Sequence, residues 1–364
     1  MIHGHGGNIF ALARELGCRP EELTDMSSNI NPLGPVPGLI AHLQAQVPRI
    51  QSLPEVDAAR ACADLAGLLH IDPAHILAGA GTTQFIYNAC RALNSRKVLI
   101  VAPTYADYAD ACRQQGIEPD FFCTQPEAQF RLDLAELAPL LPNYDTLFLC
   151  TPNNPSGQLT PLAELAKLAR RHPQLRCIID TSYLPFAVPE LQNSLAALQA
   201  GADNLLVLWS GSKIFAMPGL RTGFLIAKPE LLAAFQHLAQ PWSLSTLAQE
   251  AMHFLCNNQM AVQQFVLETH RFIQSEKQLF IERLSASPLR LFPSDTSFFL
   301  IALPPPLQAE KVRMAMLQER ILIRNCANFH GLDNRYIRIA LKDSASNARC
   351  AKLLLQLAKG GSGA

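Results

Sequence analysis

Residues 210–213 of the 364-residue chain read Ser-Gly-Ser-Lys, and Arg221 follows within a Pro-Gly-Leu-Arg-Thr-Gly segment. The hydroxyls of Ser210 and Ser212 and the guanidinium fork of Arg221 are good phosphate ligands. The amine of Lys213 can condense with an aldehyde. A lone Ser-x-Ser-Lys segment is more often a solvated turn, but an arginine eight residues after the lysine makes the pattern much more specific. The segment therefore predicts a phosphate seat beside a reactive amine.

Polar residues also follow two expected strands. Asn154 lies in a Thr-Pro-Asn-Asn-Pro-Ser-Gly segment after apolar residues 146–150, and Asp180 and Tyr183 follow apolar residues 176–179. Ligands of open parallel sheets lie at the carboxyl ends of strands. An Asn-Pro turn is usually structural, and an aspartate at a strand end can simply cap a helix. Position makes all three residues candidates for the same site as Lys213.

A further candidate segment, Ala-Gly-Ala-Gly-Thr-Thr-Gln at residues 78–84, leads into an apolar helix. Glycines before a helix N-terminus present backbone N–H groups to an anion, so Gly81, Thr82 and Thr83 are candidate phosphate ligands. Tyr105, in a Pro-Thr-Tyr segment, is compatible both with core packing and with a place at the site.

The elements that must position these residues alternate along the chain. Continuous apolar runs at residues 97–101, 146–150, 176–179, 204–209 and 223–227 predict strands covered on both faces, and residues 162–171 predict an intervening helix. This pattern predicts an α/β fold with a mostly parallel sheet in a large domain. The last third is helical from about Leu247 and then has short strands near residues 297–303 and 336–341, which predicts a smaller α+β domain. We expect an N-terminal arm at residues 1–35, the large domain at 36–240, the small domain at 241–358 and a flexible tail at 359–364.

In this order and spacing, the segments resemble the signature of the class I and II aminotransferases, which are PLP-dependent transferases of fold type I. The resemblance implies pyridoxal 5′-phosphate (PLP) as the cofactor, bound covalently by Lys213. It also implies that Asp180 pairs with the pyridine nitrogen, and that Asn154 and Tyr183 bond the phenolic oxygen. Lys213, Asp180 and Tyr183 are thus the expected catalytic residues. The other implied contacts, with the phosphate group and the ring face, come from Gly81, Thr82, Thr83, Tyr105, Ser210, Ser212 and Arg221.

Nearly the whole chain is also similar to the L-threonine-O-3-phosphate decarboxylases of cobalamin biosynthesis. This likeness rests on His-Gly-Gly-Asn at residues 5–8, Ser-Ser-Asn-Ile-Asn-Pro-Leu-Gly at 27–34 and the segments at 321–328 and 331–338. A phosphorylated amino acid carries two anionic groups, so its site needs two cations beyond the cofactor phosphate seat. The resemblance implies that Arg338 binds the substrate carboxylate and that Arg324 is the second cation. The other implied substrate contacts are His5, Asn29 and Asn154.

The resemblance leaves alternatives open. Three remain. The first is an aminotransferase acting on histidinol phosphate or a related phosphorylated amine, the second is a decarboxylase of L-serine O-phosphate, and the third is a non-catalytic PLP-binding protein. Threonine phosphate and serine phosphate differ by one methyl group, and a binding site discriminates a methyl group by only about 1–3 kcal/mol. We expect a homodimer, because family active sites form at the subunit interface. Leu53 stands where relatives usually carry a tyrosine that reaches the neighbouring cofactor phosphate, so that contact is lost or replaced.

The amino-acid composition limits the classes of partner that we expect for this chain. Hydrophobic residues make up 49% of the chain and charged residues 16%, which suits a large buried core rather than disorder. Thirty basic residues balance thirty acidic ones without a dense basic run, so neither nucleic acid nor a membrane is an expected partner. Ten scattered cysteines without Cys-x-x-Cys spacing predict no disulfide frame and no metal site. With no signal peptide at the N-terminus, these features predict a cytoplasmic protein.

Overall fold

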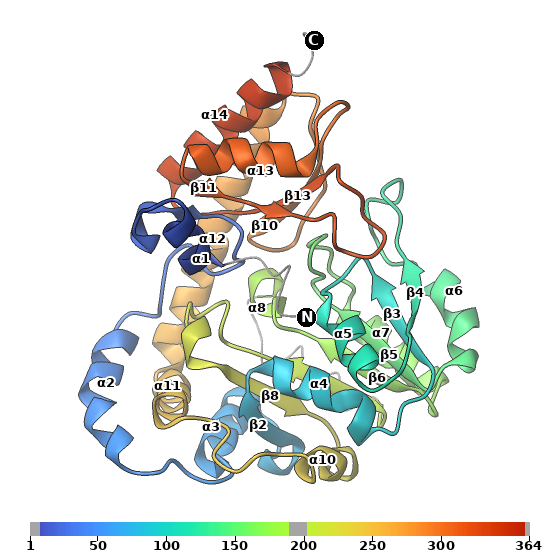
Figure 1. The fold of residues 1–364 in the computed structure, drawn as a ribbon. Coiled ribbons are helices and arrows are strands. Elements are labelled where there is room, and N and C mark those ends of the chain that lie inside the picture. Colours follow the sequence, from blue (N-terminus) through green and yellow to red (C-terminus); the bar gives the residue numbers. More distant parts are fainter. Residues whose placement is uncertain (1–7, 189–201, 361–364) are drawn as a thin grey trace.

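The computed structural model describes residues 8–188 and 202–360. In these residues the largest sheet has seven strands, in the lower half of Figure 1. Strand β8 runs antiparallel to both of its neighbours, and the other strands share one direction. In order across the sheet the strands are β2 (Ile76–Ala80), β8 (Thr222–Ile226), β7 (Leu205–Trp209), β6 (Arg176–Asp180), β5 (Thr146–Cys150), β3 (Val98–Ala102) and β4 (Asp120–Cys123).

The apolar runs explain these strands. Strands β3, β5, β7 and β8 are buried at every position, as expected for strands covered on both faces. The predicted strand at residues 146–150 is confirmed as β5, and the other four predicted strands of this sheet are found within one residue at each end. Strands β2 and β4 were not predicted; they lie at the two edges of the sheet and are partly exposed. The prediction of an α/β fold with a mostly parallel sheet is confirmed.

Helices cover both faces of this sheet. Helix α7 (Leu162–Arg171), which has the bounds predicted from sequence, buries Leu162, Leu165 and Ala169 along one stripe and exposes its charged residues. The other helices of this part are α2 (Leu39–Gln46), α3 (Ala59–Leu69), α4 (Thr82–Ala92), α5 (Asp107–Gln114), α6 (Leu134–Leu137), α8 (Leu184–Ala187), α10 (Pro229–Gln236) and α11 (Thr246–Asn257).

A second unit lies above the large sheet in Figure 1. Its four antiparallel strands follow the order β12 (Arg324–Asn325), β13 (Tyr336–Ala340), β10 (Phe298–Ala302) and β9 (Arg290–Leu291). The N-terminal segment joins this unit, because β1 (Thr24–Asp25) pairs in parallel with β11 (Ile321–Leu322). Its helices are α1 (Ile9–Glu15), α13 (Ala309–Gln318) and α14 (Ser344–Gly360).

The two units have separate hydrophobic cores linked by one long helix. Helix α12 (Gln259–Leu284) contributes Phe265 and Ile273 to the core around the large sheet, and Phe280 and Leu284 to the core of the second unit. Met26 also belongs to the second core. The packing supports an N-terminal arm attached to the small domain, while the domain boundaries themselves stay a prediction. Of the tail predicted at residues 359–364, residues 359–360 end α14 and the rest lies outside the described part.

One close contact fixes the sheet against α4. A side chain at Gly223 on β8 would place its Cβ 2.2 Å from the backbone of Gly81 and Thr82, so only glycine lets β8 lie this close to the start of α4. Gly81 itself has a φ of +81°, which favours glycine. Among the described residues, no helix is both long and apolar enough to cross a membrane.

Candidate active site

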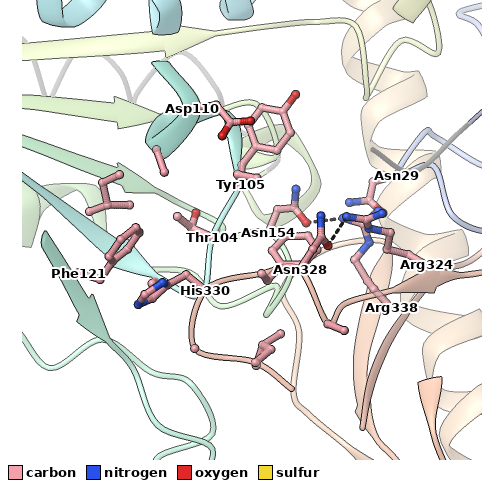
Figure 2. A pocket seen from close by; sticks show the side chains of 18 of the residues that line it. Asn29, Thr104, Tyr105, Asp110, Phe121, Asn154, Arg324, Asn328, His330 and Arg338 are labelled. Atoms are coloured by element: carbon pink, nitrogen blue, oxygen red, sulfur yellow. Dashed lines mark hydrogen bonds between the residues drawn. The ribbon is translucent and has the colours of Figure 1, made fainter. Parts of the chain in front are cut away.

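Two cavities adjoin at the carboxyl ends of β5, β6 and β7, with Tyr105, Asn154, Tyr183 and Lys213 in the lining of both. The larger cavity, of about 690 Å³, reaches to the second unit and contains Arg324 and Arg338 (Figure 2). The smaller one measures about 180 Å³. The residues predicted to contact the cofactor all line the smaller cavity: Gly81, Thr82, Thr83, Tyr105, Asn154, Asp180, Tyr183, Ser210, Ser212, Lys213 and Arg221.

Lys213 follows β7 in the short segment that joins this strand to the turn before β8. Burial lowers the pKa of its amine to about 8, and the positive charges of Arg338 and Arg221 act in the same direction. Asp180 opposes this shift without cancelling it. A substantial fraction of the amine is therefore neutral near physiological pH, which is the form that attacks an aldehyde.

Asp180, the last residue of β6, presents the carboxylate of the smaller cavity. Its Oδ1 accepts a hydrogen bond from the backbone N–H of Ser182 at 2.9 Å, and its Oδ2 accepts one from the Tyr108 hydroxyl at 2.8 Å. A buried carboxylate with two donors keeps lone pairs free. It can therefore also pair with a protonated ring nitrogen inside the cavity.

The start of α4 and the segment around Arg221 form an anion seat. The guanidinium of Arg221 lies so close to Gly81 that a Cβ added there would be 2.6 Å from a guanidinium nitrogen. In the described part of the chain, Arg221 makes no ion pair with a carboxylate. Ser210 and Ser212 each donate a hydrogen bond to the carbonyl of Thr222 at 3.1 Å, which holds both hydroxyl oxygens beside the seat. Backbone donors, hydroxyls and a guanidinium in one place suit a phosphate group.

The smaller cavity fits PLP. The anion seat provides for the phosphate, Lys213 for the aldehyde and Asp180 for the ring nitrogen. Tyr183 and Asn154 line the cavity beside them. Tyr183 accepts a hydrogen bond from Asn29 Nδ2 at 3.2 Å, and burial raises the pKa of Tyr183 to about 12, so it stays a hydroxyl donor at neutral pH.

Arg338, on the buried strand β13, points toward the larger cavity from the second unit. It donates to the side-chain oxygen of Asn154 and, at 2.5 Å, to the carbonyl of Ser27. Its Nε is buried without a hydrogen-bond partner, and so is Oδ1 of Asn29. Unpaired buried polar atoms are rare in folded proteins and indicate a missing ligand at this position.

Arg324 lies directly across the strand pair from Arg338 in the register of β12 and β13. Burial lowers its pKa, and the charge of Arg338 adds to this effect. Arg324 donates to Oδ1 of Asn328 at 2.6 Å (Figure 2). Its guanidinium also lies over the ring of Phe329. Like charges directly opposite each other on paired strands are destabilising. An anionic ligand with two charged groups would relieve this repulsion.

The structure also supplies site residues that sequence reasoning missed. Tyr108 bonds Asp180, Asn328 bonds Arg324, and Ser27 holds Arg338 through its carbonyl. Tyr108 follows Tyr105 by three positions, but nothing in the sequence indicates that it contacts Asp180. His5, predicted to contact the substrate, lies outside the described residues.

The sequence matches the family model described as aminotransferase class I and II over residues 21–354. The chain belongs to the class I and II aminotransferases. Threonine-phosphate decarboxylase from Salmonella typhimurium is 33% identical over 366 residues, covering 98% of this chain and 97% of that protein.

Solved structures of this family share the fold. L-threonine-O-3-phosphate decarboxylase from Porphyromonas gingivalis matches with a TM-score of 0.81 and 29% identity, over 93% of this chain and all of that one. The histidinol-phosphate aminotransferase from Clostridium acetobutylicum matches with a TM-score of 0.83 and 26% identity, with the same coverage. Both decarboxylases and aminotransferases of this family therefore share the fold of this chain.

The first prediction concerns the amine. PLP added to the cofactor-free protein, followed by borohydride reduction, should label Lys213 covalently, as located by peptide mass spectrometry. Labelling should become faster as the pH rises through about 8, because the neutral amine is the reactive form and the pKa of Lys213 lies there. The Lys213→Ala variant should lose the label.

Lys167→Ala is the matched control, because Lys167 is an exposed lysine on α7 that pairs with Glu164 and with no other carboxylate of the described residues. It should be labelled at Lys213 as fast as the wild type. Stoichiometric labelling of a different lysine in the Lys213→Ala variant would show that the amine is wrongly assigned.

Proposed function

We propose that this chain is a PLP-dependent carboxy-lyase that converts L-threonine O-3-phosphate into (R)-1-amino-2-propanol O-2-phosphate in cobalamin biosynthesis. The observation that carries the proposal is the facing pair Arg324 and Arg338, two cations beside the cofactor cavity. A substrate with a carboxylate and a phosphate provides one anion for each. The similarity to threonine-phosphate decarboxylase along nearly the whole chain supports the same substrate.

The proposed reaction breaks the bond between Cα and the carboxylate, releases CO₂ and returns a proton to Cα. The bound cofactor supplies the electron sink for this step. Arg338 and Asn154, which are bonded to each other, bind the carboxylate beside Lys213. Arg324, with Asn328 and Asn29, binds the phosphate. The amine of Lys213 can hold or move a proton near neutral pH because its pKa is about 8.

The residues of the smaller cavity orient the cofactor in this proposal. Asp180 keeps the ring nitrogen protonated, because a neighbouring negative charge favours the charged form of a base. Tyr183 and Asn154 bond the phenolic oxygen, and Tyr105 lies against the ring. Gly81, Thr82, Thr83, Ser210, Ser212 and Arg221 bind the phosphate.

Transamination of histidinol phosphate is the second candidate, favoured by the size of the larger cavity and by the solved aminotransferase structures with this fold. A phosphorylated amine lacks a carboxylate, so it leaves one of the two arginines unpaired while it is bound. A phosphorylated amino acid pairs both in a single complex. This difference favours the decarboxylase.

We infer a homodimer from an exposed apolar surface, termed the 40–56 surface. Exposed fractions of its side chains are 53% for Ile40, 61% for Ile50, 75% for Leu53 and 54% for Val56. Trp242, 48% exposed, joins it because its backbone N–H bonds the carbonyl of Val56. Monomeric proteins rarely expose large contiguous apolar patches. A second copy of the chain is the occupant expected from family resemblance.

We further propose the cytoplasm as its location. All ten cysteines are free thiols, and most are buried among apolar residues. Free buried thiols are typical of proteins that work in a reducing compartment.

The proposed activity is tested by incubating the PLP-loaded protein with L-threonine O-3-phosphate without any keto acid. Mass spectrometry should detect CO₂ release and a product that retains the phosphate. Conversion of the cofactor to its amine form with histidinol phosphate, and no CO₂ from threonine phosphate, would instead establish the aminotransferase. L-serine O-phosphate run in parallel measures the effect of the substrate methyl group.

Substitutions of Arg324 and Arg338 should weaken the binding of different ligands. (R)-1-Amino-2-propanol O-2-phosphate carries a phosphate but no carboxylate, and L-threonine carries a carboxylate but no phosphate. Arg324→Gln should weaken binding of the first about 10- to 100-fold and spare the second, and Arg338→Gln should do the reverse. Equilibrium binding to the PLP-loaded protein measures both.

The control is Arg335→Gln, which removes an exposed arginine near the same sheet whose side chain, within the part of the chain that the structure describes, pairs with Asp333 alone. It should change neither affinity. Equal losses for both ligands in the Arg324→Gln variant would contradict separate anion sites.

The proposed homodimer can be tested by its mass in solution. Light scattering should give twice the 39.9 kDa of one chain. Leu53→Asp should raise the dimer dissociation constant at least about tenfold, because it buries a charge in the proposed interface. Met314→Asp, at a side chain 44% exposed on α13 of the second unit, should leave the mass unchanged. A monomeric wild-type mass with full activity would refute the dimer.

A further inference from the structure

In the lining of the smaller cavity, Tyr108 hydrogen-bonds the carboxylate that is expected to face the cofactor ring. Its hydroxyl donates to Oδ2 of Asp180 at 2.8 Å. Both residues are buried, with exposed fractions of 1% for Tyr108 and 6% for Asp180. They lie on α5 and β6, 72 positions apart in the sequence. Hydrogen bonds between a neutral donor and a buried charge are among the stronger ones in proteins.

Packing holds the Tyr108 ring in place. It stacks on Phe148 of β5 with 5.3 Å between ring centroids and 17° between the ring planes. Tyr105 meets it edge-on at 5.8 Å and 86°. Tyr105 is the residue proposed to lie against the cofactor ring. Tyr108 therefore supports two residues of the cofactor cavity, one through a hydrogen bond and one through ring packing.

The Tyr108 hydroxyl keeps its proton near neutral pH and can therefore donate to Asp180. Burial raises the pKa of Tyr108 well above its usual range, and the neighbouring Asp180 carboxylate adds to the shift. Cys150 also faces this pair, and burial raises the pKa of its thiol as well. Neither neighbour carries a negative charge near neutral pH. Asp180 is thus the single carboxylate of this buried group among the residues that line the smaller cavity.

A buried carboxylate that is free to rotate would not hold its acceptor oxygens in one fixed orientation. The Ser182 N–H fixes Oδ1 and the Tyr108 hydroxyl fixes Oδ2, so the plane of the Asp180 carboxylate is determined from both sides. Each oxygen keeps an acceptor position. The remaining direction is the one that faces the cavity.

We propose that Tyr108 is a positioning residue that orients the Asp180 carboxylate toward the cofactor ring nitrogen. The inference rests on the PLP-binding part of the proposed function and is independent of which substrate reacts. In this proposal Tyr108 contacts neither the substrate nor the reacting atoms, and its hydroxyl acts through Asp180.

A double-mutant cycle tests this dependence. Tyr108→Phe removes the hydroxyl and keeps the ring that packs on Phe148 and Tyr105. It should weaken PLP binding about tenfold, as measured by absorbance titration of the cofactor-free protein. In an Asp180→Asn background the same change should alter the affinity by less than about twofold, because the carboxylate on which Tyr108 acts is absent.

Circular dichroism checks that each variant is folded, and Tyr336→Phe is the matched control. Tyr336 is a tyrosine buried in a separate cluster with Phe130 and Phe292, so removing its hydroxyl should leave PLP affinity unchanged. In turnover, Tyr108→Phe should lower kcat and leave KM nearly unchanged, because the arginines of the larger cavity are untouched.

Equal losses of affinity in the wild-type and Asp180→Asn backgrounds would overturn the proposal, and so would a Tyr108→Phe variant with wild-type affinity. The cofactor titration uses no substrate. A protein that binds PLP with the predicted coupling but does not decarboxylate threonine phosphate would therefore refute the proposed reaction and leave the role of Tyr108 standing.

Discussion

Positive charge concentrated at one edge of the large sheet is the constraint on which the rest of the site depends. Arg221, Arg324 and Arg338 form no ion pair with a carboxylate within the described residues, and Lys213 lies among them. Asp180 alone opposes this charge within the smaller cavity. Charges removed from water need partners. Phosphate and carboxylate groups of ligands can supply them. Burial, together with the same excess of positive charge, lowers the pKa of Lys213 to about 8, where its amine is reactive.

The fold keeps these like charges close by placing them on regular elements. Arg338 lies on a strand buried at all five positions, and its guanidinium is tied to Asn154 of the large unit and to the Ser27 carbonyl of the N-terminal segment. Repulsion between Arg324 and Arg338 therefore cannot be relieved by a simple side-chain rotation. Helix α12, which contributes to both cores, fixes the two units that carry the opposite walls of the larger cavity.

Residues adjoining strongly apolar strands could be predicted from sequence, because the strand ends fix their position. Asp180 and Asn154 are of this kind, and the structure places both in the smaller cavity. Tyr108 could not be assigned, because its contact with Asp180 depends on how α5 packs across β5. The facing of Arg324 and Arg338 depends on the register of two paired strands, which a sequence does not reveal. The reversed direction of β8 was hidden for a related reason, since a strand buried on both faces looks the same in either direction.

Fixed anion sites also bear on the choice of reaction. A cofactor of this kind can assist cleavage of more than one bond at Cα, so the protein selects the bond by how it holds the substrate. With a phosphate at Arg324 and a carboxylate at Arg338, a substrate is held at both ends, and rotation about the bonds of Cα is restricted. The carboxylate direction is then set by Arg338 and Asn154 rather than by the substrate. A ligand bound through its phosphate alone keeps that rotational freedom, so two facing arginines limit which bond of Cα is presented for cleavage.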